Sequence, residues 1–201
     1  VAFVPGRGTS TTIVSSLNPS KAGETVTFTA TVTPHIPSTP LTGGVIFVFD
    51  GTLVASVPID AAGTASFSTS TLTPGAHEVM ASYSGNMDYD SSATSLTQTV
   101  DQIATSVVLA SSANPSNLGA SVTFTATVTA ASGAAPGGTV TFSIDGTDQA
   151  PATLGGGQAT LATSTLGVGS HQIAARYDGD TAHTASASSP LSQEVVALGS
   201  I

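Results

Sequence analysis

One string of eight residues occurs twice in this chain. The string VTFTATVT spans residues 26–33 and again 122–129, an offset of 96 residues in a chain of 201. The alternation of Val, Phe, Ala and Val with Thr is typical of a β-strand with one buried face and one wet face. An identity of this length at a domain-sized offset indicates an internal duplication. We therefore weigh every other residue by whether it has a counterpart in the second copy.

Further segments return in the same order, with offsets between 94 and 96 that change only where loops are expected. The matched pairs are 18–19 and 114–115, 45–51 and 140–146, 72–83 and 166–177, and 96–98 and 191–193. Each copy carries about seven short alternating segments separated by turn signals, among them Asp50-Gly51 and Asp145-Gly146, which are interpreted as hairpin turns. The chain is therefore predicted to be all-β, with two tandem immunoglobulin-like Greek-key β-sandwiches.

The first copy predicts the positions of the strands. We expect strands over 11–16, 24–33, 45–49, 53–57, 64–70 and 93–100, and a corner followed by a strand within 72–83. Five phenylalanines fall in phase with the buried faces: Phe28, Phe47, Phe67, Phe124 and Phe142. The predicted domains are an N-terminal extension strand at 1–10, repeat 1 at 11–101 and repeat 2 at 102–201, joined near 101–105.

Composition excludes several classes of function. The chain has no Cys, so it has no disulfides and no thiolate sites. Three Lys and Arg residues against 12 Asp and Glu residues cannot form a basic patch, so nucleic acid is not expected as a partner. No apolar run reaches the roughly 18–20 residues of a membrane span, so we expect no membrane insertion. The chain begins with Val and shows no signal peptide, which indicates a mature product or an excised fragment.

These motifs together resemble those of a known family. The run SxNPSxxGxxVTFTATVT, then GG-V-F-x-DG, then LxxGxHxxxAxYxGD is similar to the bacterial immunoglobulin-like repeat and covers roughly 11–100 and 107–196. The resemblance implies an immunoglobulin-like sandwich, an extracellular or cell-surface location, and a spacer or adhesion role without catalytic residues. The first copy departs from the pattern at Asn86, where the second copy has Asp180.

Two of the four histidines are duplicated. His77 and His171 each follow Leu-x-x-Gly-x, and we expect each ring to bond back to the backbone and hold a corner. His35 and His183 have no counterpart and are interpreted as surface residues.

Two acidic turns are the candidate metal sites. Asp88 and Asp90 in one copy, and Asp178 and Asp180 in the other, offer oxygen ligands of the kind that Ca²⁺ prefers. Turns also favour Asp for local backbone bonding, so this is the competing interpretation. Apart from this candidate Ca²⁺, the chain shows no cofactor-binding pattern. It has no nucleophile elbow and no phosphate-binding loop before a helix, so no catalytic residue is predicted.

A glycan or surface ligand is the alternative to a purely structural role. Tyr83 and Tyr177 are duplicated and are expected to point into the sandwich, whereas Tyr89 has no aromatic counterpart. Stacking on a sugar would therefore involve Tyr89 and the unduplicated loop 34–44.

The apolar residues 1–4 occupy the phase of the last strand of a preceding repeat. Two hypotheses follow: the chain is part of a longer array, or it is a filament subunit whose terminal strand pairs with the next subunit. The expected partners are accordingly neighbouring repeats or identical subunits. The expected function is a non-enzymatic spacer, stalk or fibre module of a bacterial surface or secreted protein.

Overall fold

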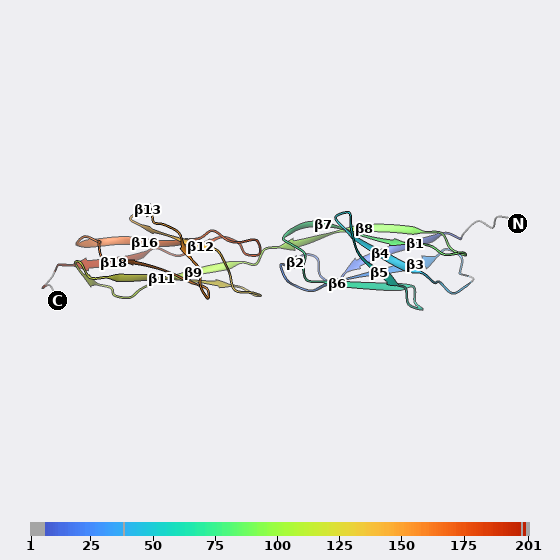
Figure 1. Ribbon diagram of the computed structural model, residues 1–201, viewed down its shortest axis with the longest axis horizontal. Coiled ribbons are helices and arrows are strands. Elements are labelled where there is room, and N and C mark those ends of the chain that lie inside the picture. The colour runs from blue at the N-terminus through green and yellow to red at the C-terminus, as the bar shows by residue number, and fades with distance from the viewer. Residues whose placement is uncertain (1–6, 38, 198, 200–201) are drawn as a thin grey trace. The chain divides into compact units, whose positions relative to one another are not determined.

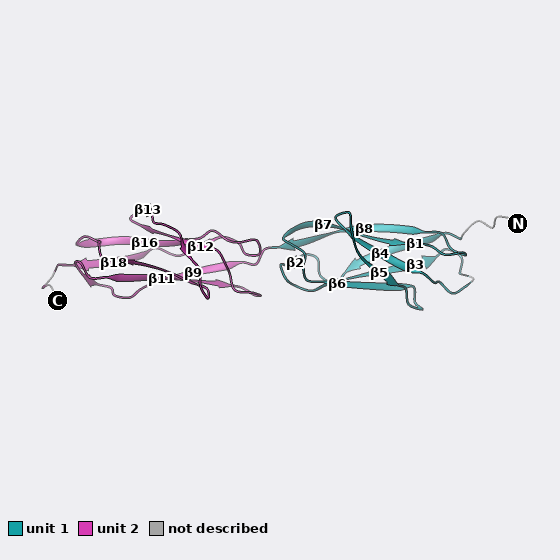
Figure 2. Cartoon of the chain, in the orientation of Figure 1, with its two compact units in different colours: residues 1–101 teal, residues 102–201 magenta. Residues whose placement is uncertain are grey.

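The computed structural model describes residues 7–37, 39–197 and 199, and these residues form strands and loops without a helix. The chain divides into two compact units, residues 1–101 and residues 102–201, which are coloured separately in Figure 2. Each unit has its own core. The all-β fold with two tandem immunoglobulin-like domains is confirmed. The predicted extension strand falls largely on residues 1–6, which lie outside the described residues.

Unit 1 is a sandwich of two sheets (Figure 1). One sheet has the order β1-β3-β6 and the other has the order β2-β8-β7-β4-β5. The strands are β1 (Thr9–Ser15), β2 (Ser20–Lys21), β3 (Val26–Pro34), β4 (Gly44–Phe49), β5 (Thr52–Pro58), β6 (Thr64–Thr69), β7 (Gly75–Tyr83) and β8 (Ser92–Asp101). All pairs are antiparallel except β2 with β8, which are parallel.

Unit 2 repeats this plan. Its sheets have the orders β9-β11-β15 and β10-β18-β16-β12-β13, with β14 paired to β12 and β17 paired to β16. The strands are β9 (Thr105–Ser111), β10 (Ser116–Asn117), β11 (Val122–Ala130), β12 (Thr139–Ile144), β13 (Thr147–Asp148), β14 (Ala152–Thr153), β15 (Gln158–Thr163), β16 (Gly169–Tyr177), β17 (Ser186–Ala187) and β18 (Leu191–Val196).

The duplicated string forms β3 and β11, the central strands of the smaller sheets. Along β3 the Val, Phe, Ala and Val side chains are buried while the intervening Thr side chains are partly exposed, as the alternation predicts. Four of the five predicted core phenylalanines are fully buried, and Phe67 is partly buried against the same core.

The two units differ where proline interrupts a strand. The single strand β5 of unit 1 corresponds to β13 and β14 in unit 2, and Pro151 lies directly before the second piece. In the same way β8 corresponds to β17 and β18, which are separated by a segment that ends at Pro190. Proline has no N–H to donate to a sheet ladder, which accounts for both breaks. No helix suited to crossing a membrane occurs in the described part of the chain.

Candidate functional site: polar clusters and a hollow at the loop end

A buried glutamine joins the first and last strands of each unit. In unit 1, Gln98 is fully buried on β8, and its Oε1 accepts a hydrogen bond from Ser15 Oγ at 2.7 Å. Its Nε2 donates to the Leu17 carbonyl at 2.9 Å and lies 3.3 Å from Ser20 Oγ. These contacts lie where the chain leaves β1 in one sheet and enters β2 in the other. The glutamine therefore satisfies the backbone at the point where strand pairing is interrupted.

Unit 2 has the same cluster. Gln193 Oε1 accepts from Ser111 Oγ at 2.6 Å, and Gln193 Nε2 donates to the Ala113 carbonyl at 2.9 Å. An asparagine beside each glutamine completes the crossing, since Asn114 Nδ2 donates to the Ser192 carbonyl and Asn114 Oδ1 accepts from the Glu194 N–H. Asn18 makes the equivalent pair of bonds in unit 1. Gln98 and Gln193 occupy matching positions in the two copies, but the sequence pattern alone indicates no role for them.

The duplicated histidines hold corners, as predicted, and each also contacts a carboxylate. His77 Nε2 donates to the Thr73 carbonyl at 2.7 Å, and its Nδ1 lies 2.7 Å from Asp50 Oδ2. In unit 2, His171 makes the same contacts with the Gly167 carbonyl at 3.0 Å and with Asp145 Oδ2 at 2.7 Å. Both neighbours of each ring are acceptors, so only the imidazolium form donates to both.

These contacts shift the titration of both partners. The hydrogen bond that His77 donates to Asp50 raises the pKa of His77, and the bond to the Thr73 carbonyl adds to the effect. The hydrogen bond from His77 in turn lowers the pKa of Asp50, with a further contribution from the Glu78 N–H. The aspartates were interpreted only as turn residues. That part is correct, since Asp50 and Asp145 have φ near 50° in their hairpins, but the carboxylates also pair with the histidines.

A ring in each unit connects two loops at the opposite end of the strands. Tyr89 is 1% exposed, and its hydroxyl donates to the Thr39 carbonyl at 2.9 Å. His183 lies in the equivalent loop of unit 2, is 3% exposed, and contacts the Ala134 carbonyl through Nε2 at 3.1 Å. The interpretation of His183 as a surface residue is therefore wrong. Tyr89 cannot offer its ring face to a sugar, because that face is packed inside unit 1. His35, by contrast, is exposed as expected.

Asn86 and Asp180 perform the same task in these loops. Asn86 Oδ1 accepts from the N–H groups of Asp88 and Tyr89, each at 2.8 Å. Asp180 Oδ1 accepts from the N–H groups of Ala182 and His183, also at 2.8 Å. An amide oxygen and a carboxylate oxygen are equally able to accept such bonds, which explains why the two copies can differ here.

Asp180 differs from Asn86 in carrying a charge. Burial alone would raise the pKa of Asp180, but hydrogen bonds from the Gly137 N–H, from the His183 side chain and from the loop N–H groups outweigh it. The pKa of Asp180 therefore lies well below its usual range. Its carboxylate also lies 2.8 Å from His183 Nδ1.

The other three candidate calcium ligands are more exposed. Asp88 Oδ2 accepts from Thr39 Oγ1 at 3.3 Å, Asp178 Oδ1 lies 3.4 Å from Arg176 Nη1, and Asp90 is exposed. Over residues 7–37, 39–197 and 199, the structure brings no three His, Cys, Asp or Glu side chains together in an arrangement suited to a metal ion.

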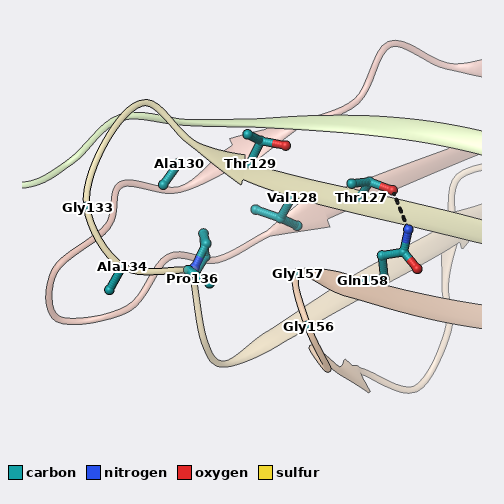
Figure 3. Close-up of a pocket in the computed structure, with 11 residues that line it drawn as sticks. Thr127, Val128, Thr129, Ala130, Gly133, Ala134, Pro136, Gly156, Gly157 and Gln158 are labelled. Carbon is teal, nitrogen blue, oxygen red and sulfur yellow. Dashed lines mark hydrogen bonds between the residues drawn. The ribbon is translucent and has the colours of Figure 1, made fainter.

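A hollow opens at one end of unit 2, beside the last residues of β11 (Figure 3). Its volume is about 350 Å³. The lining comes from the end of β11, from the loop that follows it and from the turn before β15, and most of its side chains are small. The lining residues labelled in Figure 3 include Val128, Ala130, Ala134, Pro136 and Gly157.

The two sandwiches and their duplicated clusters can be compared with known proteins. A family model described as "Bacterial Ig-like domain (group 3)" matches residues 12–101 and 109–196. The chain belongs to this bacterial Ig-like family. The resemblance noted in the sequence is thereby confirmed. A search of curated proteins finds no match.

Several solved structures are also similar to this chain at low sequence identity. The fibronectin(III)-like modules of Clostridium thermocellum CbhA are 22% identical with a TM-score of 0.37, covering 93% of each chain. The Yersinia pseudotuberculosis adhesin InvE is 20% identical with a TM-score of 0.43, covering 92% of this chain and 58% of that one. The Escherichia coli adhesin FdeC is 17% identical with a TM-score of 0.36, covering 92% and 64%.

Proposed function

We propose that this chain is a non-enzymatic structural module in which two bacterial Ig-like domains act as spacers within a bacterial surface or secreted protein. The observation that supports this most directly is the duplication of the polar clusters. The glutamine crossing, the histidine corner and the loop-connecting ring occur in both units, and each bonds to the backbone of its own unit. Residues that catalyse or bind a ligand would be aimed at an open cleft instead.

The chemistry of these clusters suits a spacer. Each cluster joins segments far apart in the sequence, such as Ser15 with Gln98 and Thr39 with Tyr89. They therefore stabilise the sandwich without a disulfide, and the chain has no Cys. Family membership supports the extracellular or cell-surface location that the sequence implied.

Single-molecule force spectroscopy of the 201-residue chain tests this proposal. A pair of independent spacers should unfold in two separate steps, each releasing roughly 30 nm of contour length for about ninety residues at the usual extended length per residue. Both steps should appear without any added ligand or ion. A chain that extends without resistance, or that resists only with a ligand bound, would contradict the spacer role. A parallel glycan array is expected to show no saturable binding.

A further inference from the structure

The hollow of unit 2 has a filled counterpart in unit 1. Leu41 of unit 1 packs against the core, and its Cδ2 lies 3.3 Å from the position that a Cβ on Gly63 would take. At the equivalent Gly157 of unit 2, only the Val128 carbonyl oxygen lies within 4 Å of that position. The residue aligned with Leu41 is Pro136, whose ring lacks the reach of a leucine side chain. Pro136 is itself buried, and beside it unit 2 has the hollow, whereas unit 1 holds a branched aliphatic side chain at this position.

The unduplicated loop of unit 1 presents a side chain of that kind. Ile36 is 64% exposed and lies between Pro34 and Pro37. The loop is held at two points, because the His35 N–H donates to the Gly8 carbonyl at 2.9 Å and the Tyr89 hydroxyl donates to the Thr39 carbonyl. A loop anchored in this way loses little further conformational entropy when Ile36 is buried by a partner.

We propose that Ile36 of one copy inserts into the hollow beside Val128 and Pro136 of a second copy. The partner is thus this chain itself. The segment 34–42 contains no Asp, Glu, Lys or Arg, and neither does the lining of the hollow. Two copies that each carry a formal charge of −9 can meet at these uncharged surfaces without desolvating a charge. The contact differs from the terminal-strand addition considered above, which depends on residues 1–4.

Ile36 lies in unit 1 and the hollow lies in unit 2, so each copy carries both halves of the contact. Copies that exchange Ile36 reciprocally form a closed dimer, whereas copies joined head to tail form longer assemblies. Because one side chain buries far less than the ~1,200 Å² of a standard interface, the contact is weak and acts where copies are crowded, as on a cell surface.

Analytical ultracentrifugation of the 201-residue chain from micromolar to millimolar concentration is the test. We expect the weight-average mass of the wild type to rise with concentration. Ile36→Ser removes the inserted group, and Pro136→Leu fills the hollow as Leu41 does in unit 1. Each variant is expected to weaken self-association about tenfold or more, because full burial of an isoleucine contributes at least that factor. Val168→Ser, at an exposed valine that does not line the hollow, is the matched control and should associate like the wild type.

Mixing the variants separates this contact from any other. Ile36→Ser retains the hollow and Pro136→Leu retains Ile36, so an equimolar mixture should form dimers but no longer assemblies. If Pro136→Leu melts early, Ala134→Leu fills the same hollow from an exposed loop position. A wild type that stays monomeric up to millimolar concentration overturns the proposal. So does an Ile36→Ser variant that associates like the wild type.

Discussion

Replacing Gln193 with leucine tests whether the buried amide stabilises the strand crossing of unit 2. Leucine has nearly the same volume, so the change removes hydrogen bonds without opening a large cavity. Gln193 is fully buried and contacts Ser111, Ala113 and Ser116. Gln172→Leu is the matched control, because Gln172 is exposed on β16 of the same unit.

The expected loss follows from the groups left behind. A buried polar group without its partner costs about 1–3 kcal/mol, and each lost bond a further ~1 kcal/mol. The penalty is less than the sum over all contacts, because Ser111 Oγ lies 3.0 Å from the Ala113 carbonyl and, without Gln193, can donate its single proton to that acceptor. We therefore expect a loss of about 2–4 kcal/mol in the free energy of unfolding. That is a large fraction of the roughly 5–15 kcal/mol typical of one domain.

Differential scanning calorimetry provides the measurement. For a domain of this size about 1 kcal/mol shifts Tm by roughly 4–8 °C, so a loss of about 2–4 kcal/mol should lower the unit 2 transition by roughly 8–32 °C. The unit 1 transition is an internal reference, since Gln98 is unchanged. Gln172→Leu should alter stability by less than about 0.5 kcal/mol. If Gln193→Leu and Gln172→Leu differ by less than about 0.5 kcal/mol in the free energy of unfolding, the buried amide does not stabilise the crossing and our reasoning is refuted.

Four further predictions concern titration, the buried hydroxyls, the charged loop and the candidate ion. The raised pKa values of His77 and His171 contribute stability that is fully present below about pH 6.5 and is lost as pH rises through the pKa values of the folded protein. The lowered pKa values of Asp50 and Asp145 contribute stability that is present above about pH 3.8 and is lost as pH falls through the pKa values of the folded protein. Tm should therefore be highest between about pH 3.8 and about pH 6.5. His77→Phe should flatten the decline of Tm at higher pH for unit 1 alone, and an unchanged dependence of Tm on pH would refute this role of His77. Tyr83→Phe loses the 2.7 Å bond to the Thr42 carbonyl and should cost about 0.5–1.5 kcal/mol. Tyr177→Phe should cost less than that in urea unfolding, because the Tyr177 hydroxyl lies near the Asp180 carboxylate but makes no hydrogen bond of standard geometry in the described part of the chain; equal losses would contradict this. Asp180→Asn should keep the Oδ1 bonds from the Ala182 and His183 N–H groups, as the amide of unit 1 does, but lose the bond that Oδ2 accepts from the Gly137 N–H. Chemical-shift mapping should show changes confined to the loops that contact Asp180, and changes spread through unit 2 would contradict this. The calcium hypothesis predicts a rise in Tm with millimolar Ca²⁺ that is lost when the four candidate aspartates are replaced by Asn, and an unchanged Tm would refute it.

Local alternation allowed much of this fold to be predicted from the amino-acid sequence. The duplicated string predicted a half-buried strand, and β3 and β11 confirm it, because a strand's period of two depends only on neighbouring residues. Asp50-Gly51 predicted its hairpin for a similar reason, since the turn needs residues that tolerate positive φ. The repeat offset and the family motifs are also properties of the sequence alone.

The tertiary structure decided the roles of the polar residues. Gln98 lies on β8 in the same alternation as Leu96 and Val100, so its phase indicated burial, but its partner Ser15 lies 83 residues earlier in the chain. His183 lacks a histidine counterpart and was interpreted as a surface residue, yet it occupies the place of Tyr89. These roles depend on contacts between loops that only the packed sandwich brings together. For the same reason, the sequence shows the exchange of Leu41 for Pro136, but only the structure shows the hollow that it leaves.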